Sequence, residues 1–260
     1  MLTSKIALRV DDVSKSFGGL KAMRNIDLEI AEGQRISVIG TNGAGKSTLF
    51  NAIAGVFPVT SGRIELFGED VTRLATAKRA KRGLARTFQT SRLFEQLTAA
   101  ENVFIALGGA EFHGSSLRPA WPASKGATTR RRWARADQLL EQVALDDKGA
   151  IIVADLSHGE QRQLELAMAL ALSPKLLMLD EPAAGFSPGE RLHLIQLLRD
   201  LPSEITLLLI EHDMDIALAV AHRVVVMHDG EKILDGSPAD IRASEQVREI
   251  YLGGRLDDVA

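Results

Sequence analysis

The segment Gly40-Thr41-Asn42-Gly43-Ala44-Gly45-Lys46-Ser47 decides the fold of this chain, because of what stands on either side of it. The apolar run Ile36-Ser37-Val38-Ile39 precedes it and predicts a buried parallel strand. A helical pattern follows from about Lys46 to Ala54, and Gly55 is placed to end that helix. A buried strand, a glycine-rich turn and a helix in this order predict an α/β fold.

This glycine-rich segment matches the pattern G-x-x-x-x-G-K-[ST], which is typical of phosphate-binding loops. Gly43 and Gly45 allow a tight backbone whose N–H groups point inward at phosphate oxygens, and the positive end of the following helix adds to the attraction. Lys46 can reach the β- and γ-phosphates, and the hydroxyl of Ser47 can bind Mg²⁺. The alternative is a merely flexible glycine loop, which the flanking strand and helix disfavour.

The rest of the chain alternates between strand-like and helix-like stretches. Strands are predicted at 6–10, 26–30, 63–67, 176–179 and 205–210, and as a hairpin at 224–227 and 231–234. Helices are predicted at 130–143, 157–172, 190–199 and 214–221. The stretch from Gly108 to Thr129 is expected to be irregular, within a mainly helical insertion at about 85–155. Alternating strands and helices predict a mainly parallel sheet.

The composition of the 260 residues excludes several classes of protein. There is no cysteine, which excludes disulfide scaffolds, thiol nucleophiles and zinc sites with thiolate ligands. The 31 Lys and Arg against 34 Asp and Glu give a formal charge of −3, which disfavours a surface built wholly for nucleic acid. No apolar segment reaches the roughly 18 residues of a membrane span, and the N-terminus does not resemble a secretory signal. We therefore expect a cytoplasmic location.

A second apolar strand ends in two acidic residues, in the run Leu176-Leu177-Met178-Leu179-Asp180-Glu181. The carboxyl ends of parallel strands form the edge where ligands bind in open α/β sheets. Asp180 is therefore a candidate Mg²⁺ ligand, directly or through water, and Glu181 is a candidate general base for an attacking water. Taken alone, the two residues would be interpreted as solvated loop acids. Beside a phosphate-binding loop, we favour the catalytic interpretation.

The run Leu156-Ser157-His158-Gly159-Glu160-Gln161 has two interpretations. Ser157 and Glu160 fit the S-x-x-E capping box, which is a sufficient reason for both residues at a helix start. The same helix N-terminus, with the hydroxyl of Ser157 and the bare backbone of Gly159, could instead hold a γ-phosphate presented by another subunit. The sequence leaves both interpretations open.

These motifs and their order resemble those of the ATP-binding subunits of ABC transporters, from about Leu8 to Gly253. The Leu-Ser-x-Gly-[Glu/Gln]-Gln signature is the discriminating element, because a phosphate loop alone fits many NTPases. The resemblance implies a RecA-like P-loop NTPase core of the α/β class with a mainly parallel sheet. It also implies an N-terminal antiparallel β-subdomain and an inserted α-helical subdomain. The ranges expected are 1–85 and 156–236 for the core with its β-subdomain, 86–155 for the insertion and 237–260 for a C-terminal tail.

The resemblance also implies roles for individual residues, with ATP and Mg²⁺ as cofactors. Phe17 is expected to stack on adenine, although it could be only an apolar residue at a strand end. The catalytic residues implied are Glu181, His212 and Gln89, of which His212 contacts the γ-phosphate. Gln89 is also expected to link the site to the helical insertion, although a polar loop residue is the plainer interpretation. Ser47, Gln89 and Asp180 are the metal ligands implied. The residues implied to contact ATP are Phe17, Gly40, Asn42, Gly43, Ala44, Gly45, Lys46, Ser47, Thr48, Ser157, Gly159 and Glu160.

Two positions depart from the family pattern. His158 stands where the signature often has Gly, and we expect its side chain to point away from the nucleotide. Ser187 stands where many ABC proteins have an Asp that connects two ATP sites. Because Ser187 cannot supply that charge, we expect the coupling between sites to be weaker or differently arranged.

The family also implies partners, because one chain does not contain a complete site. Two copies are expected to face each other head to tail around two ATP molecules, with Ser157 and Gly159 completing the site of the opposite subunit. The second ATPase is expected to be identical or a paralogue. Transmembrane permease subunits are the other direct partners implied, with a periplasmic solute-binding protein acting indirectly and no nucleic acid. The implied location is the cytoplasmic face of the inner membrane.

Within the family, the sequence is most similar to the ATPases of branched-chain amino acid importers. The runs that point there begin at Leu156 and at Asp180, together with Tyr251-Leu252-Gly253-Gly254. The alternatives kept are the ATPase of a lipopolysaccharide-export system and a non-transport ABC ATPase. The basic runs at 78–82 and 130–135 are expected to be solvated helix faces rather than a nucleic-acid surface. A GTPase is disfavoured, because no Asn-Lys-x-Asp motif is present.

Overall fold

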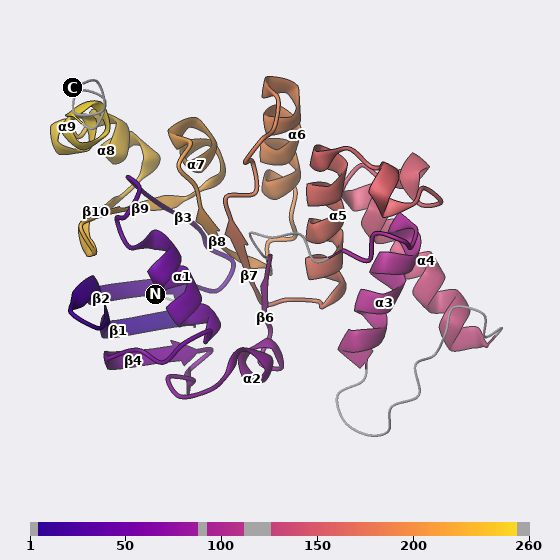
Figure 1. The fold of residues 1–260 in the computed structure, drawn as a ribbon, viewed down its shortest axis with the longest axis horizontal. Helices are drawn as coiled ribbons and strands as arrows, with labels where there is room; N and C mark the ends of the chain where they lie inside the picture. Colours follow the sequence, from indigo (N-terminus) through magenta and orange to yellow (C-terminus); the bar gives the residue numbers. More distant parts are fainter. Residues whose placement is uncertain (1–4, 88–92, 112–125, 254–260) are drawn as a thin grey trace.

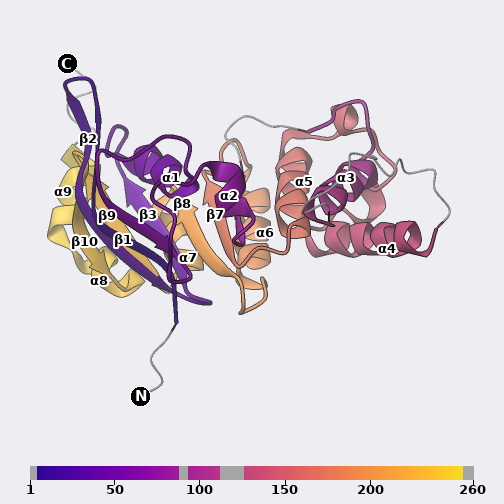
Figure 2. The ribbon, with the colours of Figure 1, turned by 90° about the horizontal axis from the view of Figure 1, so that it is seen from below.

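Two β-sheets organise the computed structural model, which describes residues 5–87, 93–111 and 126–253 (Figures 1 and 2). The strands of the first sheet are, in spatial order, β2 (Leu20–Ala31), β1 (Ile6–Phe17), β4 (Ser61–Leu66) and β5 (Glu69–Asp70). All its pairs are antiparallel. The strands of the second sheet are β10 (Glu231–Gly236), β9 (Arg223–His228), β3 (Arg35–Gly40), β8 (Thr206–Ile210), β7 (Leu176–Asp180) and β6 (Leu84–Arg86). Only β9 and β10 pair antiparallel in this sheet, so the predicted fold class is confirmed.

Helices connect these strands. Those described are α1 (Lys46–Ala54), α2 (Thr76–Ala80), α3 (Ala99–Glu111), α4 (Ala127–Gln142), α5 (His158–Ala171), α6 (Pro188–Arg199), α7 (Met214–Val220), α8 (Pro238–Ala243) and α9 (Glu245–Gly253). Short 3₁₀ turns lie at η1 (Asp146–Lys148) and η2 (Val153–Asp155). Helix α1 begins and ends where the sequence predicts, with Gly55 at its C-cap. The stretch 108–129 is partly a wrong prediction, since α3 continues to Glu111 and α4 begins at Ala127.

The central strands are buried on both faces, which explains their continuous apolar sequences. Successive side chains of a strand point to opposite faces of its sheet. Met178 and Leu208 therefore join the core around α1, whereas Leu177 and Leu207 join the core beneath α5 and α6. Burial on both faces is typical of parallel sheets covered by helices on each side.

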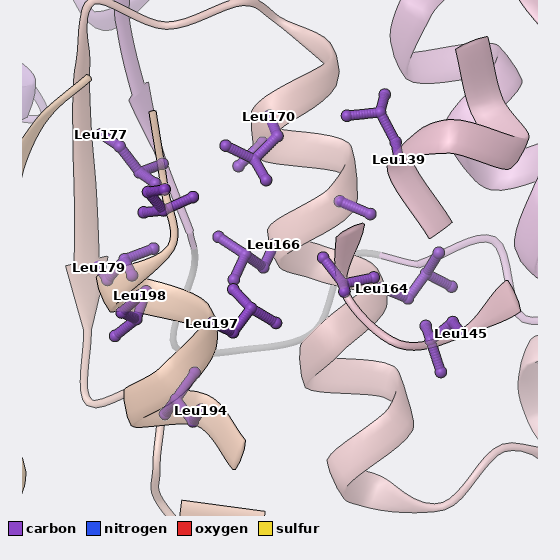
Figure 3. Packing of buried hydrophobic residues seen from close by; sticks show 14 of the residues in the cluster. Leu139, Leu145, Leu164, Leu166, Leu170, Leu177, Leu179, Leu194, Leu197 and Leu198 are labelled. Carbon is purple, nitrogen blue, oxygen red and sulfur yellow. The ribbon is translucent and has the colours of Figure 1, made fainter. Parts of the chain in front are cut away.

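Helix α5 lies between the large sheet and the pair formed by α3 and α4 (Figures 1 and 2). Figure 3 shows the leucines of this core. Those labelled are Leu177 and Leu179 from β7, Leu194, Leu197 and Leu198 from α6, Leu164, Leu166 and Leu170 from α5, Leu139 from α4, and Leu145. This packing fixes the orientation of α5. The division of the chain into core and insertion stays a prediction, and α5, which falls in the predicted core range, packs against α3 and α4.

The parallel register brings the ends of three strands to one edge of the sheet. Val38 pairs with Ile210, and Asp180 also pairs with Ile210. The turn after β3, the acids after β7 and the residues after β8 therefore meet at this edge. This is the edge at which the sequence predicts a ligand site.

Arg79 is a buried cation that closes the C-terminal end of α1. Its guanidinium donates to the carbonyl oxygens of Ala52 at 2.8 Å and Ile53 at 2.7 Å, and also to those of Leu74 and Thr72. Burial lowers the pKa of Arg79 to about 10, so it stays charged at neutral pH and complements the negative helix end. The expectation that 78–82 is a wholly solvated face is therefore wrong at Arg79, which is 1% exposed.

We expect Arg79→Ala to lower the free energy of unfolding by about 3–5 kcal/mol, because four carbonyl oxygens lose a cationic donor and the end of α1 loses a buried charge. Urea unfolding followed by circular dichroism measures this change. Arg73→Ala is the matched control, since Arg73 is exposed and has no hydrogen bond or ion pair within the described structure. It should change the free energy by less than about 0.5 kcal/mol. Equal effects of the two substitutions would contradict the capping role.

Candidate active site

The glycine-rich loop connects the carboxyl end of β3 to the start of α1. Gly45 is the N-cap of α1 with φ 95°, and a Cβ there would lie 2.8 Å from the carbonyl oxygen of Ala22. At Gly40 an added Cβ would collide with the carbonyl oxygen of Met227. Only glycine fits either position. No side chain of the N-cap residue caps the first turn of α1, and no acidic residue lies in that turn, so the turn favours an anion.

Lys46 is held inside this loop. Its Nζ donates to the carbonyl oxygen of Gly40 at 2.7 Å and to that of Thr41 at 2.9 Å. Burial lowers the pKa of Lys46, and the nearby charges of Glu181 and Asp180 oppose that effect. The ammonium group is thus aimed along the loop and faces the acids at the end of β7.

The two acids after β7 have different environments. Asp180 is 4% exposed, and its Oδ1 is buried with no hydrogen-bond partner among the described residues. Burial raises the pKa of Asp180 to about 6, the Glu181 charge adds to the rise, and Arg86 and Lys46 oppose it. A buried, unpartnered carboxylate oxygen beside Lys46 and the loop fits a divalent cation, which prefers oxygen ligands. Of the three predicted metal ligands, Asp180 and Ser47 lie within the described structure.

Glu181 and His212 come together from neighbouring strand ends. Glu181 Oε1 lies 3.9 Å from Nδ1 of His212, and both side chains are partly exposed. Glu181 has a left-handed backbone, with φ 49°, and its N–H donates to the carbonyl oxygen of Ile210 at 2.9 Å. A non-glycine residue in this region is strained, and such strain clusters at functional sites. The structure therefore brings together the predicted base and the predicted histidine.

A cavity of about 620 Å³ lies over the loop, and its lining residues come from four parts of the chain. They include Phe17 and Lys21, residues 42–48 of the loop, Glu181, and Asp229 with Gly230. Phe17 is half-exposed, and its ring meets that of Phe57 edge-on with centroids 5.2 Å apart. The placement of Phe17 at the mouth of this cavity is compatible with stacking on a base.

The predicted phosphate-contacting helix α5 lies elsewhere in the molecule. Strands β7 and β8 separate it from α1 in both views (Figures 1 and 2). Ser157 is its N-cap and forms a full capping box with Glu160, through bonds of 2.8 and 3.2 Å. The cavity over the loop is lined by neither Ser157 nor Gly159. Within one chain, the structure therefore does not bring these two residues to the remaining site residues.

The two departures from the family pattern have local explanations. Ser187 is the N-cap of α6 and forms a second capping box with Glu190, whose carboxylate accepts from the Ser187 hydroxyl at 2.6 Å. The ring of His158 lies against Gly185, where an added Cβ would be 3.3 Å from it. His158 therefore packs on the loop that leads to Ser187.

Sequence reasoning missed two features of the site. Asp229 and Gly230 were predicted only as a hairpin turn, yet the N–H of Gly230 donates to the carbonyl oxygen of Ala44 at 3.1 Å and supports the loop. Glu211 is 0% exposed, and its Oε1 accepts from the N–H of Ala183 at 3.2 Å. Its place directly after the apolar run Leu207-Leu208-Leu209-Ile210 marks it as a residue at a strand end, but does not indicate its burial. Gln89 lies outside the described residues, so its role stays a prediction.

The described helices include none long and apolar enough to cross a membrane. The same part of the chain contains no group of three or more His, Asp or Glu side chains that could hold a metal by themselves.

Comparison with known proteins gives consistent results across the chain. The family described as "ABC transporter" matches residues 23–184, and "Branched-chain amino acid ATP-binding cassette transporter" matches 231–257. The high-affinity branched-chain amino acid transport ATP-binding protein BraF of Pseudomonas aeruginosa is 39% identical over 96% of this chain and 99% of its own. The lipopolysaccharide export system ATP-binding protein LptB of Acidithiobacillus ferridurans is 34% identical over 96% and 98%.

Solved structures agree with this result. The ADP conformation of MJ1267, an ATP-binding cassette of an ABC transporter, has a TM-score of 0.82 and 29% identity, covering 95% of this chain and 99% of its own. A dimeric post-hydrolysis structure of the ATP-binding cassette MJ0796, bound to ADP and phosphate, has a TM-score of 0.75 and 26% identity, covering 89% and 98%.

The raised pKa of Asp180 predicts a pH-dependent stability. Between about pH 4 and pH 6 the unfolded chain binds fewer protons at this group than the folded chain, so the free energy of unfolding falls as the pH rises. Asn has no carboxyl group to ionise, so Asp180→Asn does not lose stability in this way as the pH rises. In a metal chelator, we expect the variant to exceed wild type by about 1–3 kcal/mol at pH 8, with the difference shrinking toward pH 4. Urea titration at each pH measures it.

Asp240→Asn serves as the opposite control. Hydrogen bonds from Ser237 hold the pKa of this exposed carboxyl below its usual value. Its replacement should therefore reduce stability at pH 8, and the reduction should shrink as the pH falls. If Asp180→Asn behaved like Asp240→Asn, the buried environment of Asp180 would not be the cause.

Proposed function

Because this chain belongs to the ABC transporter family as an ATP-binding subunit, and hydrolyses ATP as that family does, we propose that it drives the import of branched-chain or related amino acids. The observation that carries this proposal is the combined similarity to BraF over 96% of the chain and to the branched-chain family at its C-terminal end. LptB is the more distant relative, which disfavours lipopolysaccharide export. Membrane-embedded permease subunits are implied for any transport ATPase of this family.

In the proposed reaction, the loop and Lys46 bind the phosphates of ATP, and Phe17 stacks on the adenine. Glu181 accepts a proton from the attacking water, whose oxygen bonds to the γ-phosphorus while the bond to the β-phosphate oxygen breaks. His212 contacts the γ-phosphate and orients Glu181, which lies 3.9 Å away. Mg²⁺, when bound by Ser47, Asp180 and Gln89, neutralises charge that develops on the phosphates. The products are ADP and inorganic phosphate.

A second copy completes the site in this proposal. The separation of α5 from α1 within one chain supports it, because Ser157 and Gly159 need a nucleotide bound by another subunit (Figure 1). The dimer of the MJ0796 cassette with ADP and phosphate supports it further. ATP then bridges two faces, and hydrolysis removes the bridge. The second copy is identical or a paralogue, and the pair works on the cytoplasmic face of the membrane with a periplasmic solute-binding protein acting through the permease.

The first test concerns Glu181. Since a general base contributes about 10²–10⁴-fold in rate, Glu181→Gln should reduce steady-state ATP hydrolysis by that factor while leaving ATP binding intact. The variant should also accumulate ATP-bound dimers, because bridging nucleotide is no longer removed. Phosphate release and size-exclusion chromatography with ATP and Mg²⁺ measure the two effects. Hydrolysis by Glu181→Gln at the wild-type rate would remove Glu181 from this role.

The second test separates the two interpretations of Ser157. Asp caps a helix as well as Ser does, so Ser157→Asp preserves α5 but places a negative charge where a γ-phosphate would bind. We expect ATP-dependent dimerisation to be lost, with thermal stability and ATP binding to the monomer unchanged.

Ser237→Asp is the matched control, because Ser237 forms the same capping box at α8, outside the residues assigned to the site. It should leave dimerisation intact. Normal dimerisation by Ser157→Asp would show that Ser157 serves only as a cap.

A further inference from the structure

Glu211 is an acid that the proposed reaction does not use. It follows β8 directly and precedes His212, and it is 0% exposed. Its own N–H donates to the carbonyl oxygen of Val38 at 3.3 Å, which anchors its backbone to the neighbouring strand β3. A carboxyl group is rarely buried to this extent unless it has specific partners.

The carboxyl of Glu211 reaches the loop that carries the proposed base. Oε1 accepts from the N–H of Ala183 at 3.2 Å, and Ala183 stands two residues after Glu181. Glu211 itself directly precedes His212, so this one bond joins the two segments. One buried side chain therefore connects the loop of the proposed base with the loop of the proposed histidine.

This connection acts on a strained segment. Glu181 has φ 49°, which is costly for a residue with a side chain, and the conformation persists only if its surroundings impose it. Two bonds do so. The N–H of Glu181 donates to the carbonyl oxygen of Ile210, and the N–H of Ala183 donates to Glu211. Ile210 is the last residue of β8 and Glu211 directly follows it, so the Glu181 loop is held from the segment that carries His212.

The two oxygens of Glu211 have different roles. Oε2 is buried and has no hydrogen-bond partner among the described residues, whereas Oε1 is the acceptor. Burial raises the pKa of Glu211 to about 7, and the nearby acids Asp213 and Glu181 add to the rise. An acid that needs only one acceptor oxygen can be replaced by the amide of glutamine, which keeps that oxygen and the shape of the side chain.

We propose that Glu211 is a positioning residue that holds Glu181 and His212 in their reacting arrangement by joining their two loops. The inference rests on the proposed function, in which Glu181 is the base. Glu211 contacts neither substrate nor metal in this role. Its effect is on the rate of the chemical step, because a displacement of a catalytic group by about 1 Å can cost about 10²-fold.

The experiment compares Glu211→Gln, Glu211→Ala and a control at the other end of the same strand. The buried Thr206 begins β8, and its Oγ1 accepts from the N–H of Gly33 at 3.0 Å. Thr206→Val keeps the side-chain shape but removes this side-chain-to-backbone bond, so it tests the cost of a lost buried bond remote from the site. Each full-length variant is assayed for kcat and KM with ATP and Mg²⁺, for the Kd of a fluorescent ATP analogue, and for Tm.

We expect Glu211→Ala to lower kcat by about 10–100-fold while the Kd changes by less than about threefold, since the group positions the base and not the phosphates. Glu211→Gln should restore kcat to within about threefold of wild type. Thr206→Val should lower Tm without lowering kcat. An unchanged kcat in Glu211→Ala, or a kcat in Glu211→Gln as low as in Glu211→Ala, would overturn the inference. So would equal losses of kcat in Glu211→Ala and Thr206→Val.

The proposed function is tested separately in the same series. Wild-type protein and Glu181→Gln are measured first. If wild type hydrolyses ATP and Glu181→Gln does not, the proposed role of Glu181 as the base stands whatever the Glu211 variants show. If wild type fails to hydrolyse ATP, or Glu181→Gln hydrolyses it normally, the proposed function fails and this inference fails with it.

Discussion

The parallel pairing of β3, β7 and β8 is the constraint on which the whole site depends. Its register sets Val38 and Asp180 opposite Ile210, so the three strand ends share one edge. This register brings the phosphate loop, the acids and the histidine to the same edge of the sheet. The continuous apolar runs that bury both faces of this sheet therefore also determine where the strand ends, and with them the catalytic groups, lie.

Much of this could be predicted from the sequence, because the signals are local. The apolar runs at 36–39, 176–179 and 205–210 indicate buried strands, and the limits of α1 follow from the glycines on either side. Arg79 and Glu211 could not be recognised. Each is a charged residue in an unremarkable local setting, and each is buried only because segments distant in the sequence close over it. Burial of that kind is a property of tertiary contacts, which no local pattern carries.

Helix capping is a sufficient reason for two serines, Ser157 and Ser187, whose positions are functional in the family pattern. Helices α5, α6 and α8 all begin with a serine in a capping box. At α6 this serine is Ser187, where many ABC proteins have Asp. Asp and Ser are both good N-caps, so the exchange keeps the helix start while removing a charge from the loop beside Glu181. The N-terminus of α6 is therefore capped with either residue, whereas the charge of this loop differs between Ser and Asp.

The wide sequence separation of β3 from its neighbours has a consequence for biosynthesis. Strand β3 ends at residue 40, whereas its partners β8 and β9 end at residues 210 and 228. On the ribosome, the glycine-rich loop therefore emerges long before the strands and the hairpin turn that hold it. Pairing across such separations is slow, because chain closure must come first. Nascent or prematurely terminated chains therefore lack a formed nucleotide pocket, and nucleotide can stabilise only the nearly complete translation product.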